Sequence, residues 1–81
     1  MNYNESELLL NIADNVNRYL KKFGVMEISR KTGIDRTLLY RIRQGEILPS
    51  LKSLCKLAAA FNATLDDLTT YHKEIKYDTY N

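Results

Sequence analysis

Residues 27–45 read EISRKTGIDRTLLYRIRQG and contain two short helical patterns on either side of Gly33. Gly33 stands where a tight turn between helices needs a positive φ, which costs glycine little and other residues about 1 kcal/mol or more. Asp35 follows as a candidate N-cap for the second helix, and Gly45 is a stop signal for it. The stretch therefore predicts two helices joined by a tight turn.

The side chains between Asp35 and Gly45 divide into two faces. At about 100° per residue, Leu39 and Ile42 point together toward the interior. The opposite face and its flanks carry hydrogen-bond donors and no acid: Arg36, Thr37, Tyr40, Arg41 and Gln44. Arginine can bind guanine O6 and N7 with two donors, and threonine offers a hydroxyl and a methyl group for thymine. The pattern indicates a face suited to the DNA major groove.

At these positions the chain resembles the lambda repressor and Cro-type helix-turn-helix DNA-binding proteins. The resemblance extends over residues 7–69, because a downstream Pro-Ser-Leu helix and a Leu-Asp-Asp-Leu ending occur at the family's spacing. The residues that carry it are Ile28-Ser29, Gly33-Ile34, Asp35-Arg36-Thr37, Leu39, Ile42, Gln44-Gly45, Pro49-Ser50-Leu51, Leu54, Leu57-Ala58, Phe61 and Leu65-Asp66-Asp67-Leu68.

The resemblance implies an all-α, compact five-helix domain whose second and third helices form the helix-turn-helix. It also implies a sequence-specific transcriptional regulator, most simply a repressor that binds a palindromic operator on double-stranded DNA as a homodimer. The alternative is a protein-interaction module on the same fold, such as an antitoxin or a regulator of another protein. We expect base contacts from Arg36, Thr37, Leu38, Tyr40 and Arg41, and phosphate contacts from Val25, Arg30, Lys31, Arg43 and Gln44.

Outside this unit, periodicity and capping signals predict three further helices. The first begins after a Ser6 cap and ends at Gly24, the fourth runs from a Ser50 cap to Asn62, and a short fifth begins with a Thr64–Asp67 capping box. Leu51 and Cys55 are expected on the buried stripe of the fourth helix, and Leu65 and Leu68 should close the core. We therefore expect a flexible segment over 1–6, the DNA-binding domain over 7–69, and a tail over 70–81 that is a candidate dimer contact.

Three positions in the DNA-binding unit differ from the family or leave alternatives open. Val25 replaces the usual capping Thr or Ser, so a phosphate there would have to be held by backbone N–H groups. Leu38 fits either a thymine methyl group or the edge of the core. Arg43 stands where many relatives carry glutamate, and it either attracts phosphate or pairs with Glu46 or Glu27. Ser29 is expected to be a small packed residue bonded to its own backbone.

Charge is concentrated on the same unit. Residues 30–43 carry five basic side chains and one acidic side chain, a local net charge of +4, whereas the rest of the chain carries seven basic and nine acidic residues, a net charge of −2. Basic charge on one face is typical of a surface that meets phosphates.

Length, composition and motifs limit the classes of function that fit the chain. A chain of 81 residues predicts one small domain. The sequence has no phosphate-binding glycine loop, nucleophile–base pair or metal-ligand spacing, so we expect no enzyme activity, no cofactor and no small-molecule ligand. The one cysteine, Cys55, excludes an internal disulfide, and His72 is expected to be a solvent-exposed residue rather than a ligand. With no apolar run of membrane-spanning length and no secretory pattern, we expect no membrane association and a cytoplasmic location.

Overall fold

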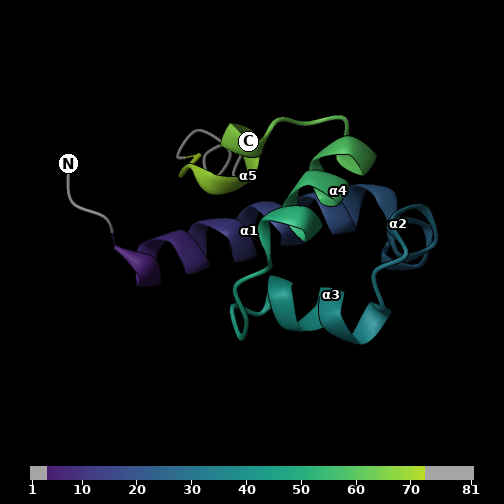
Figure 1. Cartoon of the computed structure of the whole chain (residues 1–81), viewed down its shortest axis with the longest axis horizontal. Coiled ribbons are helices and arrows are strands. Elements are labelled where there is room, and N and C mark those ends of the chain that lie inside the picture. The colour runs from purple at the N-terminus through teal and green to yellow at the C-terminus, as the bar shows by residue number, and fades with distance from the viewer. Residues whose placement is uncertain (1–3, 73–81) are drawn as a thin grey trace, which may run out of the picture.

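The computed structural model describes residues 4–72, and every regular element within that range is a helix. The helices are α1 (Glu5–Phe23), α2 (Val25–Thr32), α3 (Arg36–Arg43), α4 (Leu51–Phe61) and α5 (Leu65–Thr69). Helix α1 runs through the middle, with α3 packed on one side of it and α5 on the other (Figure 1). Helix α4 contacts α2 and α5. The predicted all-α, five-helix architecture is confirmed.

The core takes side chains from all five helices. Ile12, Val16 and Leu20 recur every fourth residue along α1, so they form one stripe that faces the other helices. Each fully buried aliphatic side chain of this kind stabilises the fold by about 1.5–3 kcal/mol. The side chains below 2% exposure are Ile12, Asn15, Val16, Leu20, Ile28, Leu39, Ile42, Leu57 and Leu68.

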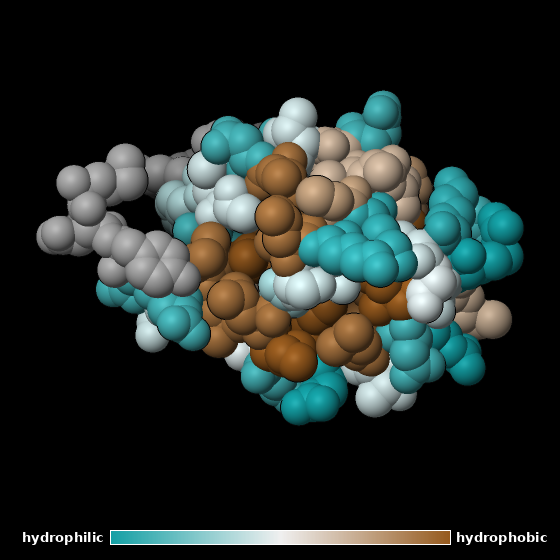
Figure 2. All heavy atoms as spheres, in the orientation of Figure 1, coloured by the Kyte–Doolittle hydropathy of each residue, from teal (hydrophilic) through white to brown (hydrophobic). Residues whose placement is uncertain are grey.

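The predicted stripe on α4 needs correction. Leu54, Leu57, Ala58 and Phe61 are buried, but Cys55 is exposed, because it lies about 100° around the helix from Leu54. Leu51, in the first turn, is 68% exposed, and Leu65 of α5 is 38% exposed, so Leu68 closes the core at that end without it. Figure 2 shows that apolar side chains are exposed near the centre of one face of the molecule, with hydrophilic groups around them.

Most predicted helix ends are confirmed. Ser50 Oγ accepts a hydrogen bond from Ser53 N–H, Asn62 has a positive φ of 57°, and the Thr64–Asp67 capping box is complete. The start of α1 was predicted wrongly: Asn4, and not Ser6, is the N-cap, and its Oδ1 accepts from Glu7 N–H at 3.1 Å. Asn4 adds a further half turn that places Glu5 and Glu7 at the positive end of the helix dipole.

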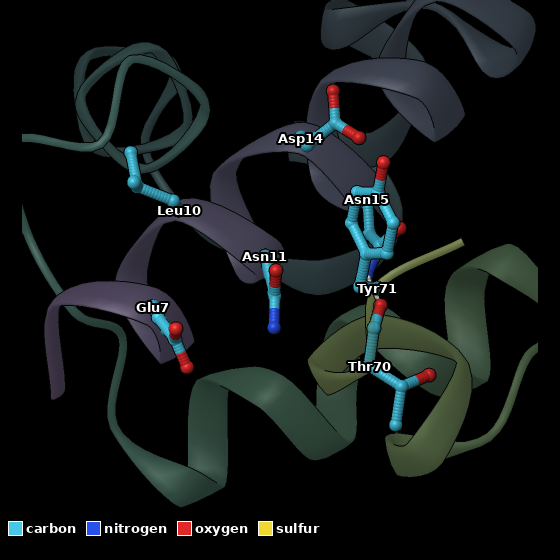
Figure 3. A pocket seen from close by; sticks show the side chains of 7 residues that line it. All are labelled: Glu7, Leu10, Asn11, Asp14, Asn15, Thr70 and Tyr71. Carbon is cyan, nitrogen blue, oxygen red and sulfur yellow. Dashed lines mark hydrogen bonds between the residues drawn. The ribbon is translucent and has the colours of Figure 1, made fainter. Parts of the chain in front are cut away.

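The end of α5 and the residue after it are held against α1 by two asparagine side chains. Asn15 is 1% exposed, and its Nδ2 donates to Leu68 O at 2.9 Å and to Thr70 O at 2.8 Å. Asn11 Nδ2 donates to Thr69 O at 3.3 Å. These two side chains and Tyr71 are among the residues that line an open groove of about 600 Å³. Figure 3 shows how the lining side chains lie around it.

The sequence predicted a solvent-exposed His72, but the residue is half-buried. Its Nε2 lies 2.9 Å from Asp67 O, and since a carbonyl oxygen only accepts, the ring donates there. Over residues 4–72 there is no group of three or more potential metal ligands and no helix that could cross a bilayer. The expected tail contacts beyond residue 72 lie outside the described residues.

Candidate nucleic-acid interface

Helix α3 presents the face that its periodicity predicts. Leu39 and Ile42 are fully buried, whereas Arg36, Thr37, Tyr40 and Arg41 are exposed, and Gln44 is exposed at the helix end. We call these five residues the α3 face. It combines two guanidinium groups, a hydroxyl, a phenol and an amide on about two turns of helix, with no carboxylate among them.

Leu38 in α3 and Asp35 just before it each have surroundings that show how the side chain is used. Leu38 is partly buried against the core, so the structure favours the core-edge alternative for most of its side chain. Asp35 has the extended conformation of an N-cap, but its exposed carboxylate makes no capping hydrogen bond. The expected cap at Asp35 is therefore present in the backbone only.

The turn that orients α3 is braced by two side chains. Gly33 has a φ of 76° and donates its N–H to Ser29 O, as a left-handed C-cap does. Thr32 Oγ1 donates to Ile28 O at 2.7 Å and accepts from Ile34 N–H at 3.1 Å. Ser29 Oγ donates to Ile34 O at 2.6 Å across the turn, so the expectation that it bonds its own backbone was wrong. Because both peptide groups of Ile34 are held, α3 is fixed relative to α2.

Helix α3 ends in a Schellman motif. Gly45, with a φ of 76°, donates its N–H to Ile42 O at 3.1 Å, and Glu46 donates its N–H to Arg41 O at 3.0 Å. A left-handed φ at this position favours glycine. The motif turns the chain sharply and places Glu46 beside the last turn of α3.

The start of α2 has no side-chain cap, as predicted from Val25 in place of the usual Thr or Ser. Gly24 is the N-cap residue and supplies no side-chain hydrogen bond, while Val25 is partly buried against the core. The first N–H groups of a helix have no intrahelical acceptor, and they carry the positive end of the helix dipole. Backbone groups, and not the valine side chain, are therefore what this end of α2 offers to an anion.

Glutamate side chains pair with several of the basic residues near α3. Glu27 accepts from Arg30 Nη2 at 2.6 Å and lies 3.7 Å from Lys31 Nζ. The hydrogen bond from Arg30 lowers the pKa of the Glu27 carboxyl below its usual value. Glu46 Oε1 lies 3.5 Å from Arg41 Nε.

Arg43 makes neither of the ion pairs considered for it. Its guanidinium carbon lies 4.9 Å from the centroid of the Tyr40 ring, a cation–π contact along one side of α3. Its two candidate partners are engaged elsewhere, because Glu46 pairs with Arg41 and Glu27 pairs within α2. Arg43 therefore keeps its positive charge available to phosphate.

Comparison with known proteins agrees with this geometry. A sequence model of the Cro/C1-type HTH DNA-binding domain matches residues 15–74. An HTH-type transcriptional regulator of Archaeoglobus fulgidus, itself uncharacterized, is 30% identical over 61 residues, which cover 73% of this chain and 87% of that protein. A second such regulator of the same organism is 28% identical and is covered to 86%. No solved structure gave a significant match.

The chain therefore belongs to the Cro/C1-type helix-turn-helix family, as its resemblance to the lambda repressor and Cro-type proteins predicted. In this fold α2 and α3 are the helix-turn-helix.

Proposed function

We propose that this chain regulates transcription by binding a specific DNA sequence with α3 in the major groove. The observation that carries the proposal is the α3 face, which projects donors from a helix that is anchored by Leu39 and Ile42 and braced at both ends. A helix of this size fits the major groove, where each base pair presents its own pattern of donors, acceptors and methyl groups.

The proposal divides the contacts by chemistry. Base edges would be contacted by Arg36, Thr37, Tyr40 and Arg41, together with the exposed edge of Leu38. Phosphates would be contacted by the backbone at Val25 and by the side chains of Arg30, Lys31, Arg43 and Gln44. Phosphate contacts give affinity that falls with salt, and base contacts give sequence preference.

We further propose that the protein acts as a repressor on a palindromic operator and binds it as a homodimer. One recognition helix makes few base contacts, and at about 1–3 kcal/mol each they discriminate poorly against a genome of competing sites. A second copy doubles the contacts. Simple occupancy of an operator is sufficient for repression, whereas activation would need a further contact with the transcription machinery.

Selection of duplexes from a random pool with the purified chain tests this function. We expect enrichment of one defined sequence arranged as an inverted repeat. Weak, salt-sensitive binding without enrichment would contradict the proposal and favour the protein-interaction module.

A further inference from the structure

The two arginines of the α3 face differ in their surroundings. Arg41 Nε lies 3.5 Å from Glu46 Oε1, whereas no described carboxylate lies within ion-pair distance of Arg36. The side chains of Arg41 and Glu46 are 54% and 50% exposed, so their pair lies at the surface that would meet DNA. A carboxylate at such a surface repels phosphate, and its presence there needs an explanation.

The backbone places these two residues next to each other, an arrangement that most surface ion pairs do not have. Most exposed pairs contribute little, because two long side chains must be ordered to form them. Here the Schellman motif joins the two residues directly, through the hydrogen bond from Glu46 N–H to Arg41 O at 3.0 Å. The positive φ of Gly45 sets the direction in which the chain leaves α3. Glu46 is therefore held next to Arg41 by the same turn that ends the helix.

The ion pair with Glu46 is closest at one nitrogen of the Arg41 guanidinium. A guanidinium carries five N–H donors, and its two terminal nitrogens form the fork that binds guanine O6 and N7. Glu46 comes closest to Nε, which is not one of the two nitrogens of that fork. Restricting the arginine in advance lowers the ordering cost of forming the base contact. The nearby carboxylate also makes Arg41 a poorer partner for phosphate.

We propose that Glu46 is a positioning residue that determines specificity: it orients Arg41 toward a guanine and diverts it from the DNA backbone. The inference rests on the proposed function, because it assigns a role within the same interface. Glu46 itself contacts no base in the proposed complex.

The chain provides a matched control in Glu27. It also pairs with basic residues near the interface, Arg30 and Lys31, but these lie on α2 and are proposed phosphate contacts. Neutralising either glutamate removes one negative charge from the same region. Only the loss of Glu46 should affect the choice of base.

The experiment titrates the full chain and its variants with two duplexes. One is the preferred duplex from the selection, and the other carries a changed base pair at the position where Arg41→Ala loses preference. We expect Glu46→Gln to reduce the ratio of the two affinities about tenfold, with binding to unrelated duplex equal or stronger. Glu27→Gln should strengthen binding to both duplexes alike. Thermal melting establishes that the variants remain folded.

The role of Glu46 would be overturned if Glu46→Gln left the ratio of the two affinities unchanged, or if Glu27→Gln reduced that ratio equally. The proposed function would stand in either case. A wild-type chain that prefers neither duplex would overturn both. In the Arg41→Ala background, Glu46→Gln should cause no further loss of preference. A further loss would show that Glu46 acts through another residue.

Discussion

Thr37 tests base recognition by a single side chain. Thr37 is exposed on α3, and removal of a base contact costs about 1–3 kcal/mol of binding free energy. We expect Thr37→Ala to weaken binding to the selected duplex by that amount with little change in melting temperature. Titration of Thr37→Val and Thr37→Ser separates the groups, since the first retains the methyl and the second the hydroxyl. Equal affinity of all three variants and the wild type would remove Thr37 from the interface.

At the residue scale, the sequence predicted the exposure of side chains on α3 better than their partners. The periodicity of α3 correctly placed Leu39 and Ile42 inside and the α3 face outside, because a rigid helix fixes the direction of every side chain. The pairing of Glu46 with Arg41 instead of Arg43 was not predictable in this way. Position 46 lies beyond the end of the helix, where the Schellman motif and not the helical period sets the geometry.

The start of α5 gives a prediction about pH. The Asp67 carboxylate accepts from Thr64 N–H at 2.9 Å, and this backbone hydrogen bond, followed by the one with the Thr64 side chain, lowers the pKa of Asp67. A lowered folded-state pKa contributes stability that is present above the unfolded pKa of about 3.9 and is lost as pH falls through the folded value. We expect acidification from pH 5 to pH 2 to lower the melting temperature less in Asp67→Asn than in the wild type.

Asp66→Asn is the control for that measurement, since Asp66 is adjacent and equally charged but lies outside the capping box. It should retain the acid sensitivity of the wild type. If Asp66→Asn reduced the pH dependence as much as Asp67→Asn, general charge and not the capping box would be its source.

At the element scale, helices were predictable because their ends carry local signals. Ser50, Asn62 and the Thr64–Asp67 box each act within three or four residues, and the structure confirms them. The start of α1 was missed because Asn4 and Ser6 are both good capping residues and the local sequence does not choose between them. The attachment of Asn15 to Leu68 and Thr70 was missed because its partners lie more than 50 residues away.

At the scale of the whole molecule, we expect two chains on one operator. Helices α1 and α4 contribute the most core residues, and α2 and α3 are assigned to DNA, so α5 and the residues after it are the proposed surface for a partner. Leu65 and Tyr71 are exposed there, at 38% and 55%. The half-sites should lie about 34–36 Å apart, or 10–10.5 base pairs between centres. Footprinting and sedimentation on the selected duplex measure both.

A charge on α5 should prevent the second chain from binding. We expect Leu65→Asp to bind the duplex as one chain with reduced affinity, while Leu51→Asp, at a more exposed leucine on α4, still binds as two. The reverse result would place the interface at the start of α4. Full-affinity binding of one wild-type chain to a single half-site would contradict the dimer itself.

The proposed function depends on recognition of DNA sequence by the α3 face. The most direct measurement is the ratio of the dissociation constants for the selected duplex and a scrambled duplex of the same composition, in the wild type and in Arg36→Ala/Arg41→Ala. We expect a wild-type ratio of about 10³ or more, which falls at least about thirtyfold in the double variant while salt-dependent binding and folding persist. A wild-type ratio near one, or a large ratio that the double variant retains, would contradict the claim.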